Sequence, residues 1–98
     1  MTETPIAREI LDYLQYRGIF CWRQNTGRRG GVQFGYVGSG DITGILPDGR
    51  RLEVEVKRPG GGRRPGQVVF GLRIQENCGV YIRAESVEDV ERQLREMR

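Results

Sequence analysis

Three charged side chains alternate with apolar ones over residues 52–57 (LEVEVK), directly before a segment rich in proline and glycine. These charged residues are Glu53, Glu55 and Lys57. Because successive side chains of a β-strand point to opposite faces, the alternation places two carboxylates and an amine on one face. A solvated strand could carry such a face, and so could an active site in which carboxylates bind a divalent metal ion. The pattern alone leaves both interpretations open.

A tight turn precedes this stretch and predicts the register of a β-hairpin. Residues 47–49 (PDG) favour a type I turn with glycine in the left-handed position, which gives a three-residue hairpin loop. If Leu46 faces Arg50 across that loop, Asp41 lies directly opposite Glu55. The predicted charged face then holds Asp41, Thr43, Glu53, Glu55 and Lys57, and the predicted core face holds Ile42, Leu46, Leu52, Val54 and Val56.

Two carboxylates held side by side are unfavourable unless a cation neutralises them, because like charges at short range disfavour ionisation. Mg²⁺ and Mn²⁺ prefer oxygen ligands, so Asp41 and Glu55 are candidate ligands of such an ion. A bound ion would contact a substrate phosphate and lower the pKa of a coordinated water. Lys57, further along the same face, would orient that water or neutralise charge in the transition state.

The composition excludes several other kinds of site. The chain has no histidine, which excludes catalytic triads, histidine general bases and zinc sites that use histidine. Cys21 and Cys78 are far apart and lack CxxC spacing, so we expect reduced, packed thiols. The formal charge of +3 mildly favours a polyanionic partner. Lys57 is the only lysine of the chain. Codon usage that favours arginine would explain the other basic residues, and it would make the one retained lysine a stronger indication of a specific role.

The periodicity predicts a single α/β domain over residues 1–98, with a mixed sheet flanked by helices. The expected order is a helix over 5–17 with Thr4 as its N-cap, a strand over 19–22, a possible short strand within 32–37, hairpin strands over 41–46 and 51–57, a helix over 66–77, a strand over 80–82 and a last helix capped by Ser86. No signal segment or bilayer-spanning apolar stretch is recognisable, so we expect a cytoplasmic protein.

Several segments in a fixed order carry a family resemblance. They are WRQNTG (22–27), GSGDITG (38–44), DGR (48–50) and EVK (55–57), followed by Gln67 and Phe70 on a predicted helix and by Gly79-Val80. This set resembles the VRR-NUC branch, the virus-type replication-repair nucleases, of the PD-(D/E)XK superfamily, in the stand-alone form of phages and bacteria. The resemblance covers nearly the whole chain and implies a restriction-endonuclease-like core.

The resemblance also implies residue roles in Mg²⁺- or Mn²⁺-dependent hydrolysis of DNA phosphodiesters. Asp41, Glu55 and Lys57 match the catalytic motif, and Gln67 matches a helical glutamine that supports the site. The implied metal-binding set consists of Asp41, Glu55, the carbonyl of Val56 and, through water, Glu9. Gly40 stands where the family motif often has proline, which is a common departure in this branch.

The predicted partner is DNA, held by arginines beside glycines that let a phosphate backbone approach. The candidate DNA-binding residues are Arg23, Asn25, Arg28, Arg29, Arg58, Arg63 and Arg64. Small members of this branch resemble Holliday-junction resolvases, which implies a homodimer acting on branched DNA such as four-way junctions or flaps in a bacterial or phage-infected cell. The apolar stripe of the last helix is one candidate surface for the second copy. The alternative is a non-catalytic DNA-binding module with a nuclease-like fold, or a small basic partner protein.

Overall fold

A computed structural model describes residues 3–24, 27–29, 32–34 and 40–97, and for residues 27–29 and 32–34 it describes the backbone alone. The elements are α1 (Glu3–Tyr16), β1 (Phe20–Arg23), β2 (Gly27–Arg29), β3 (Val32–Phe34), β4 (Ile42–Ile45), β5 (Arg51–Val56), α2 (Pro65–Glu76), β6 (Val80–Ala84) and α3 (Val87–Glu96). The predicted order is confirmed except for one further short strand, β2. Helix α1 begins at Glu3, so Thr4 lies inside the helix and is not its N-cap.

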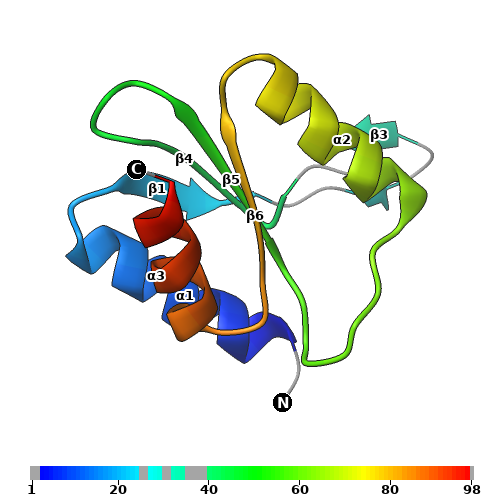
Figure 1. Cartoon of the computed structure of the whole chain (residues 1–98). Coiled ribbons are helices and arrows are strands. Elements are labelled where there is room, and N and C mark those ends of the chain that lie inside the picture. The colour runs from blue at the N-terminus through cyan, green and yellow to red at the C-terminus, as the bar shows by residue number, and fades with distance from the viewer. Residues whose placement is uncertain (1–2, 25–26, 30–31, 35–39, 98) are drawn as a thin grey trace.

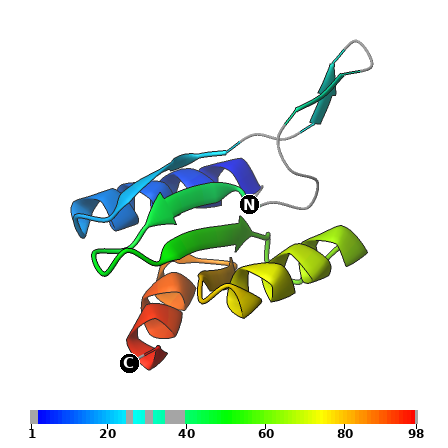
Figure 2. The ribbon, with the colours of Figure 1, turned by 90° about the horizontal axis from the view of Figure 1, so that it is seen from above.

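A four-stranded mixed sheet in the order β1-β4-β5-β6 forms the centre of the molecule. The pairs β1–β4 and β4–β5 are antiparallel, and β5–β6 is parallel. Helices α1 and α3 lie on one face of this sheet and α2 lies on the other (Figure 1). Strands β2 and β3 pair only with each other and stand apart from these layers (Figure 2).

The β4–β5 hairpin has the register that its turn predicts. The Leu46 N–H donates to the Arg50 carbonyl at 2.8 Å, and the Gly49 N–H donates to the Leu46 carbonyl at 2.8 Å. Gly49 has φ +93°, a left-handed conformation that glycine adopts without strain. The ladder then pairs Thr43 with Glu53, as expected. A local turn therefore places the acidic strand against its neighbour.

The main core fills the space between the sheet and helices α1 and α3. Ile6, Ile10 and Leu14 recur at about one helical turn along α1 and are at most 3% exposed. They pack in one cluster with Val54 and the other even-numbered residues of β5. This arrangement confirms the predicted core face of the hairpin and fixes the direction in which its odd-numbered side chains point.

The opposite face of β5 is also buried, which excludes the interpretation as a solvated strand. Glu53 and Glu55 are both 0% exposed. The reason is that β5 lies between β4 and β6 in the sheet while α2 packs over this face, with Phe70 and Gly71 directed inward. Both carboxylates therefore need polar partners inside the protein.

Helix α3 uses its apolar stripe within the chain. Ser86 caps the helix as predicted, because its hydroxyl accepts a hydrogen bond from the Asp89 N–H at 3.1 Å. Val90 is fully buried, and Leu94 and Met97 pack against the main core. The stripe therefore packs largely within the chain, with Leu94 and Met97 only partly buried, and its use as a dimer surface stays a prediction.

The two cysteines are free but differ in environment. Cys21 is buried on β1, and this burial raises the pKa of its thiol. Cys78 is exposed at φ +65° in the turn that follows α2, so the expectation of a packed thiol is wrong there. Within the described ranges, the structure contains no helix that is long and apolar enough to cross a membrane.

Candidate active site

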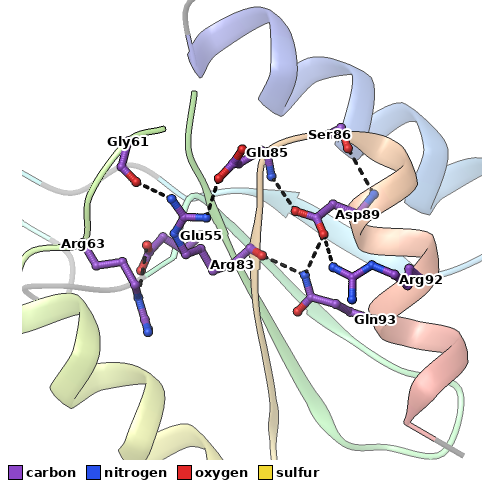
Figure 3. Close-up of polar contacts among 9 residues, drawn as sticks. All are labelled: Glu55, Gly61, Arg63, Arg83, Glu85, Ser86, Asp89, Arg92 and Gln93. Atoms are coloured by element: carbon purple, nitrogen blue, oxygen red, sulfur yellow. Dashed lines mark hydrogen bonds and ion pairs between the residues drawn. The ribbon is translucent and has the colours of Figure 1, made fainter. Parts of the chain in front are cut away.

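Glu55 lies near the end of the central strand β5, and its two carboxylate oxygens have different environments. The Tyr81 hydroxyl donates a hydrogen bond to Oε1. Oε2 is buried and accepts no hydrogen bond from any described residue, although Arg63 Nε forms an ion pair with it at 3.5 Å (Figure 3). One oxygen is thus held in place, while the other is only partly neutralised.

Tyr81 reaches Glu55 because of the parallel pairing between β5 and β6. The register places Tyr81 beside Glu53 and one step from Glu55 along the ladder. Its ring packs on Gly71, where a Cβ atom would lie 2.9 Å from the ring, and meets Phe70 edge-on with centroids 6.1 Å apart. Burial and the neighbouring Glu55 raise the pKa of Tyr81, so its hydroxyl keeps the proton that it donates.

Arg63 belongs to the loop that joins β5 to α2. Arg83 on β6 holds this loop by donating a hydrogen bond to the Gly61 carbonyl and is itself paired with Glu85 at 2.8 Å (Figure 3). The Arg63 guanidinium also lies 5.4 Å from the centroid of the Tyr81 ring, within cation–π range. The position of Arg63 over Glu55 is therefore supported by contacts to the neighbouring strand.

Asp41 contacts the backbone of β5 instead of extending the ladder. Its N–H donates to the Val54 carbonyl at 2.8 Å, and its Oδ2 accepts from the Val56 N–H at 2.7 Å. In an unbroken ladder, that Val56 N–H would bond to the carbonyl of residue 40. The regular pairing ends at Ile42 and Val54, so the predicted pairing of Asp41 directly opposite Glu55 is wrong, although Asp41 still lies against the same end of β5.

Several groups act on the Asp41 carboxylate. Burial raises its pKa most strongly, and the nearby negative charge of Glu3 raises it further. The hydrogen bond from Val56 and the positive charges of Arg23 and Lys57 lower the pKa, and the net effect is a raised value. The ionised Asp41 side chain is therefore destabilising in the folded protein at neutral pH when no metal ion is bound.

We expect Asp41→Asn to raise the midpoint of thermal unfolding at pH 7 in EDTA. The raised pKa means that the folded state retains a proton that the unfolded chain releases, so stability falls as the pH rises from the ordinary value of 3.8 through the folded value. Asparagine removes the charge and keeps an oxygen for the Val56 N–H. Below pH 3.8 both side chains are neutral, and the gain should disappear. Unfolding followed by circular dichroism at both pH values checks this, and a lower midpoint at pH 7 would contradict it.

Lys57 follows β5 and lies at the same end of the strand. Its N–H donates to the Ala84 carbonyl at 2.9 Å, which continues the pairing with β6, and the residue is 8% exposed. Its positive charge acts on Asp41, yet among the described residues it forms no ion pair within 4.0 Å. A largely buried amine beside a carboxylate is suited to stabilising negative charge that develops nearby.

Glu53 differs from Glu55 although it shares the strand face and the burial. Its Oε1 accepts from the Gly40 N–H at 3.2 Å, and its Oε2 pairs with Arg51 Nε at 2.9 Å. Both of its oxygens therefore have hydrogen-bond partners. Glu53 is accounted for as a structural residue and provides a matched comparison for Glu55.

The two helical candidates lie in other settings. Glu9 is exposed on α1, and the acidic residue of that helix whose charge acts on Asp41 is Glu3. Gln67 stands at the third position of α2, where its Oε1 accepts from the Arg64 N–H at 3.0 Å. This contact closes the start of the helix. Roles of Glu9 and Gln67 in catalysis stay predictions.

The candidate DNA-binding arginines fall at two places in the described chain. Arg23 ends β1, while Arg58, Arg63 and Arg64 are exposed in the loop between β5 and α2. The predicted contacts of Asn25 and of the side chains of residues 28 and 29 lie outside the described residues. The loop arginines follow directly after the strand that carries Glu55 and Lys57.

Sequence reasoning missed two residues that act on the acidic groups, Tyr81 on Glu55 and Glu3 on Asp41. Tyr81 had a weak signal, because it alternates with apolar residues on a predicted strand and so faces away from the main core. Nothing in the sequence indicated that Glu3 lies near Asp41, because that proximity depends on how α1 packs against the sheet. An exposed aromatic pair was also missed: the rings of Phe20 and Trp22 are 5.2 Å apart on the edge strand β1, next to Arg23.

The donors present fit a hard, partly hydrated cation better than a closed protein cage. Within the described part of the chain, no group of three or more histidine, cysteine, aspartate or glutamate residues is placed to hold a metal ion. Mg²⁺ commonly takes only one or two carboxylates and completes its shell with water and substrate phosphate. The buried Oε2 of Glu55 accepts no hydrogen bond within the described part of the chain, so it is a candidate donor for such an ion if Arg63 moves away.

Comparison with known proteins gives no assignment for this chain. No family model, no curated protein and no solved structure matches it.

Proposed function

We propose that this chain is an Mg²⁺- or Mn²⁺-dependent DNA endonuclease of the VRR-NUC type, with a restriction-endonuclease-like core and a preference for branched DNA. The observation that carries the proposal is the Oε2 atom of Glu55, a buried carboxylate oxygen to which none of the described residues donates a hydrogen bond. Asp41 and Lys57 at the same end of β5 add a second carboxylate and an amine. This is the residue combination that Asp41 and the EVK segment together predict.

The energetics of Glu55 support a functional reason for its presence. A buried carboxylate oxygen that lacks a hydrogen bond costs roughly 1–3 kcal/mol or more. Glu53, one step away on the same face, avoids this penalty by pairing both of its oxygens. Among the described residues, the hydroxyl oxygen of Thr43 is the other buried side-chain atom without a hydrogen-bond partner, but it is neutral. A buried charged group whose oxygen lacks a hydrogen bond is most simply explained by a ligand that completes it.

The side chains divide the work of phosphodiester hydrolysis among them. Asp41, Glu55 and the carbonyl of Val56 would hold the ion, which when bound supplies a coordinated water of lowered pKa and neutralises phosphate charge. Lys57 orients the attacking water or stabilises negative charge on the phosphate. Tyr81 fixes the Glu55 carboxylate through Oε1.

Basic groups beside the acidic site and aromatic groups further along the edge strand β1 suit a DNA substrate. The arginines of the β5–α2 loop provide phosphate contacts beside the acidic site. Phe20 and Trp22 offer exposed rings on which unpaired bases can stack, as at a branch point. Two copies related by a two-fold axis would present two sites to a symmetric four-way junction, and this symmetry is the basis for proposing a homodimer.

The test is to incubate the purified protein with end-labelled four-way junction, flap and linear duplex DNA. We expect nicks in Mg²⁺ or Mn²⁺ and none in EDTA, with branched DNA cut faster than duplex. Paired symmetric nicks in the junction would support a dimer that carries two sites. If the protein binds these DNAs but cuts none of them in either metal ion, the enzyme proposal is wrong.

One observation favours the second candidate, a DNA-binding module without catalysis. Arg63 already neutralises part of the Glu55 charge without a metal ion. If that ion pair were permanent, the acidic site would be a structural feature of a basic DNA-binding surface. Binding that persists in EDTA, weakens steeply with added salt and is never accompanied by cleavage would support this candidate.

A further inference from the structure

We propose that Arg63 is an exchangeable counter-ion of Glu55, which a DNA phosphate draws away so that a divalent metal ion can take its place. DNA binding and metal binding would then be coupled through one side chain. This inference rests on the proposed function, because it assumes that Glu55 is a metal ligand.

The first support is the geometry of the ion pair. Arg63 Nε lies 3.5 Å from Glu55 Oε2, and this oxygen accepts no hydrogen bond among the described residues, so the pair is long and loosely made. By contrast, Oε1 accepts the Tyr81 hydroxyl hydrogen bond. One oxygen is therefore fixed by a hydrogen bond, while the other is covered by a guanidinium that is loosely paired with it and also lies against the Tyr81 ring.

The second support is the difference in exposure between the two partners. The Glu55 side chain is fully buried, whereas the Arg63 side chain is 33% exposed. Arg63 and Tyr81 also line a hollow of about 220 Å³ between α2 and β6. An anion that approaches from solvent can reach the guanidinium but not the carboxylate.

The third support is that Arg63 can move while its loop stays in place. The Arg83 side chain donates to the Gly61 carbonyl (Figure 3). The Gly61 N–H donates to the Arg58 carbonyl at 2.9 Å. Helix α2 begins two residues after Arg63. Both ends of the segment are thus anchored, so a rotamer change of one long side chain is sufficient to uncover Oε2.

The physical consequence is competition between two cations for one carboxylate oxygen. Arg63 Nε lies 3.5 Å from Oε2, so the guanidinium would repel a metal ion bound to that oxygen. Each cation would therefore weaken the binding of the other. A phosphate that pairs with Arg63 removes this competitor. By thermodynamic linkage, a bound metal ion must in return strengthen DNA binding by the same factor.

The test measures Mn²⁺ binding to the DNA-free protein by isothermal titration calorimetry. We expect Arg63→Gln to bind Mn²⁺ about tenfold more tightly than the unmodified protein, a coupling of ordinary size. Arg73→Gln, which removes the same charge from an exposed position of α2, is the matched control and should change the affinity less than about twofold. Arg63→Lys retains a cation and should fall between Arg63→Gln and the unmodified protein. Circular dichroism verifies that each variant is folded.

A second titration adds a four-way junction whose branch-point linkages are phosphorothioates, which resist hydrolysis. The junction should raise the Mn²⁺ affinity of the unmodified protein by about the factor seen in Arg63→Gln, and should give Arg63→Gln little further gain. Glu55→Gln, titrated with and without the junction, corrects for Mn²⁺ bound by the DNA itself.

The outcomes separate this inference from the function on which it rests. If Glu55→Gln leaves Mn²⁺ binding unchanged, Glu55 is not a ligand, and both the metal site and the exchange are wrong. If Glu55→Gln weakens Mn²⁺ binding but Arg63→Gln leaves it unchanged or weaker, the metal site stands and the exchange is overturned.

Discussion

Glu55→Gln is expected to lower metal-dependent DNA cleavage by at least about 100-fold while the protein remains folded. The glutamine keeps an oxygen for the Tyr81 hydroxyl, but it removes the charge that would bind the ion. Loss of the ion pair with Arg63 and relief of the penalty of the buried oxygen without a hydrogen bond act in opposite directions, so we expect the free energy of unfolding to change by less than about 1 kcal/mol. Cleavage rates on labelled four-way junctions in Mg²⁺ and Mn²⁺, together with urea unfolding, measure both effects.

Glu53→Gln is the matched control for this substitution. Glu53 lies on the same strand and the same face and is equally buried, yet its two oxygens bind the Gly40 N–H and Arg51. We expect Glu53→Gln to retain cleavage within about threefold, with a stability loss of roughly 1–2 kcal/mol from the weakened buried contacts. If Glu53→Gln lowers cleavage as much as Glu55→Gln does, the two carboxylates are equally important for cleavage. That result would refute the specific assignment of Glu55 as the metal ligand.

Gly40→Ala is expected to lower both stability and cleavage. A Cβ atom at residue 40 would lie 2.8 Å from the Val54 carbonyl oxygen and 3.1 Å from its carbon, which belong to the backbone of the central strand and cannot move aside. The clash would push residues 40–41 away from β5 and displace the Asp41 carboxylate. We expect a loss of about 1–3 kcal/mol in the free energy of unfolding and a decrease of at least about tenfold in cleavage.

Gly62→Ala provides the comparison, since a Cβ atom there would meet nothing within 4 Å. We expect its stability to stay within about 0.5 kcal/mol of the unmodified protein, with cleavage retained. Thermal unfolding and junction cleavage of the two alanine variants test the pair. If Gly40→Ala has the same stability and cleavage rate as Gly62→Ala, the close approach of residue 40 to β5 is not required for either property.

The environment of Gly40 also explains why proline would not fit at this position. The Gly40 N–H donates to the buried Oε1 of Glu53 at 3.2 Å, and proline has no N–H to give. The substituent on its Cα would meet the same Val54 carbonyl. These two contacts explain why this chain has Gly-Asp and not the Pro-Asp form of the motif that its sequence resembles.

Local signals in the sequence were sufficient for most of the elements and for the hairpin register as far as Ile42 and Val54. The turn at residues 47–49 predicted the pairing of Thr43 with Glu53, because a tight loop leaves one register in which both faces of the hairpin sort correctly. Ser86 predicted the start of α3, because a cap satisfies N–H groups within the same few residues. Helix α2 was predicted within one residue at each end, whereas β2 was missed in a glycine-rich segment without alternation.

The sequence by itself therefore determined which residues share a strand face, and it placed Glu53, Glu55 and Lys57 on the same one. The tertiary structure decided that α2 buries this face, that Tyr81 and Arg63 contact Glu55 and that Asp41 bonds to the β5 backbone. These contacts join residues 8 to 26 positions apart, and each depends on how whole elements pack. Strand alternation is a short-range property of the backbone, whereas the partner of a buried charge is set by long-range packing that no local pattern specifies.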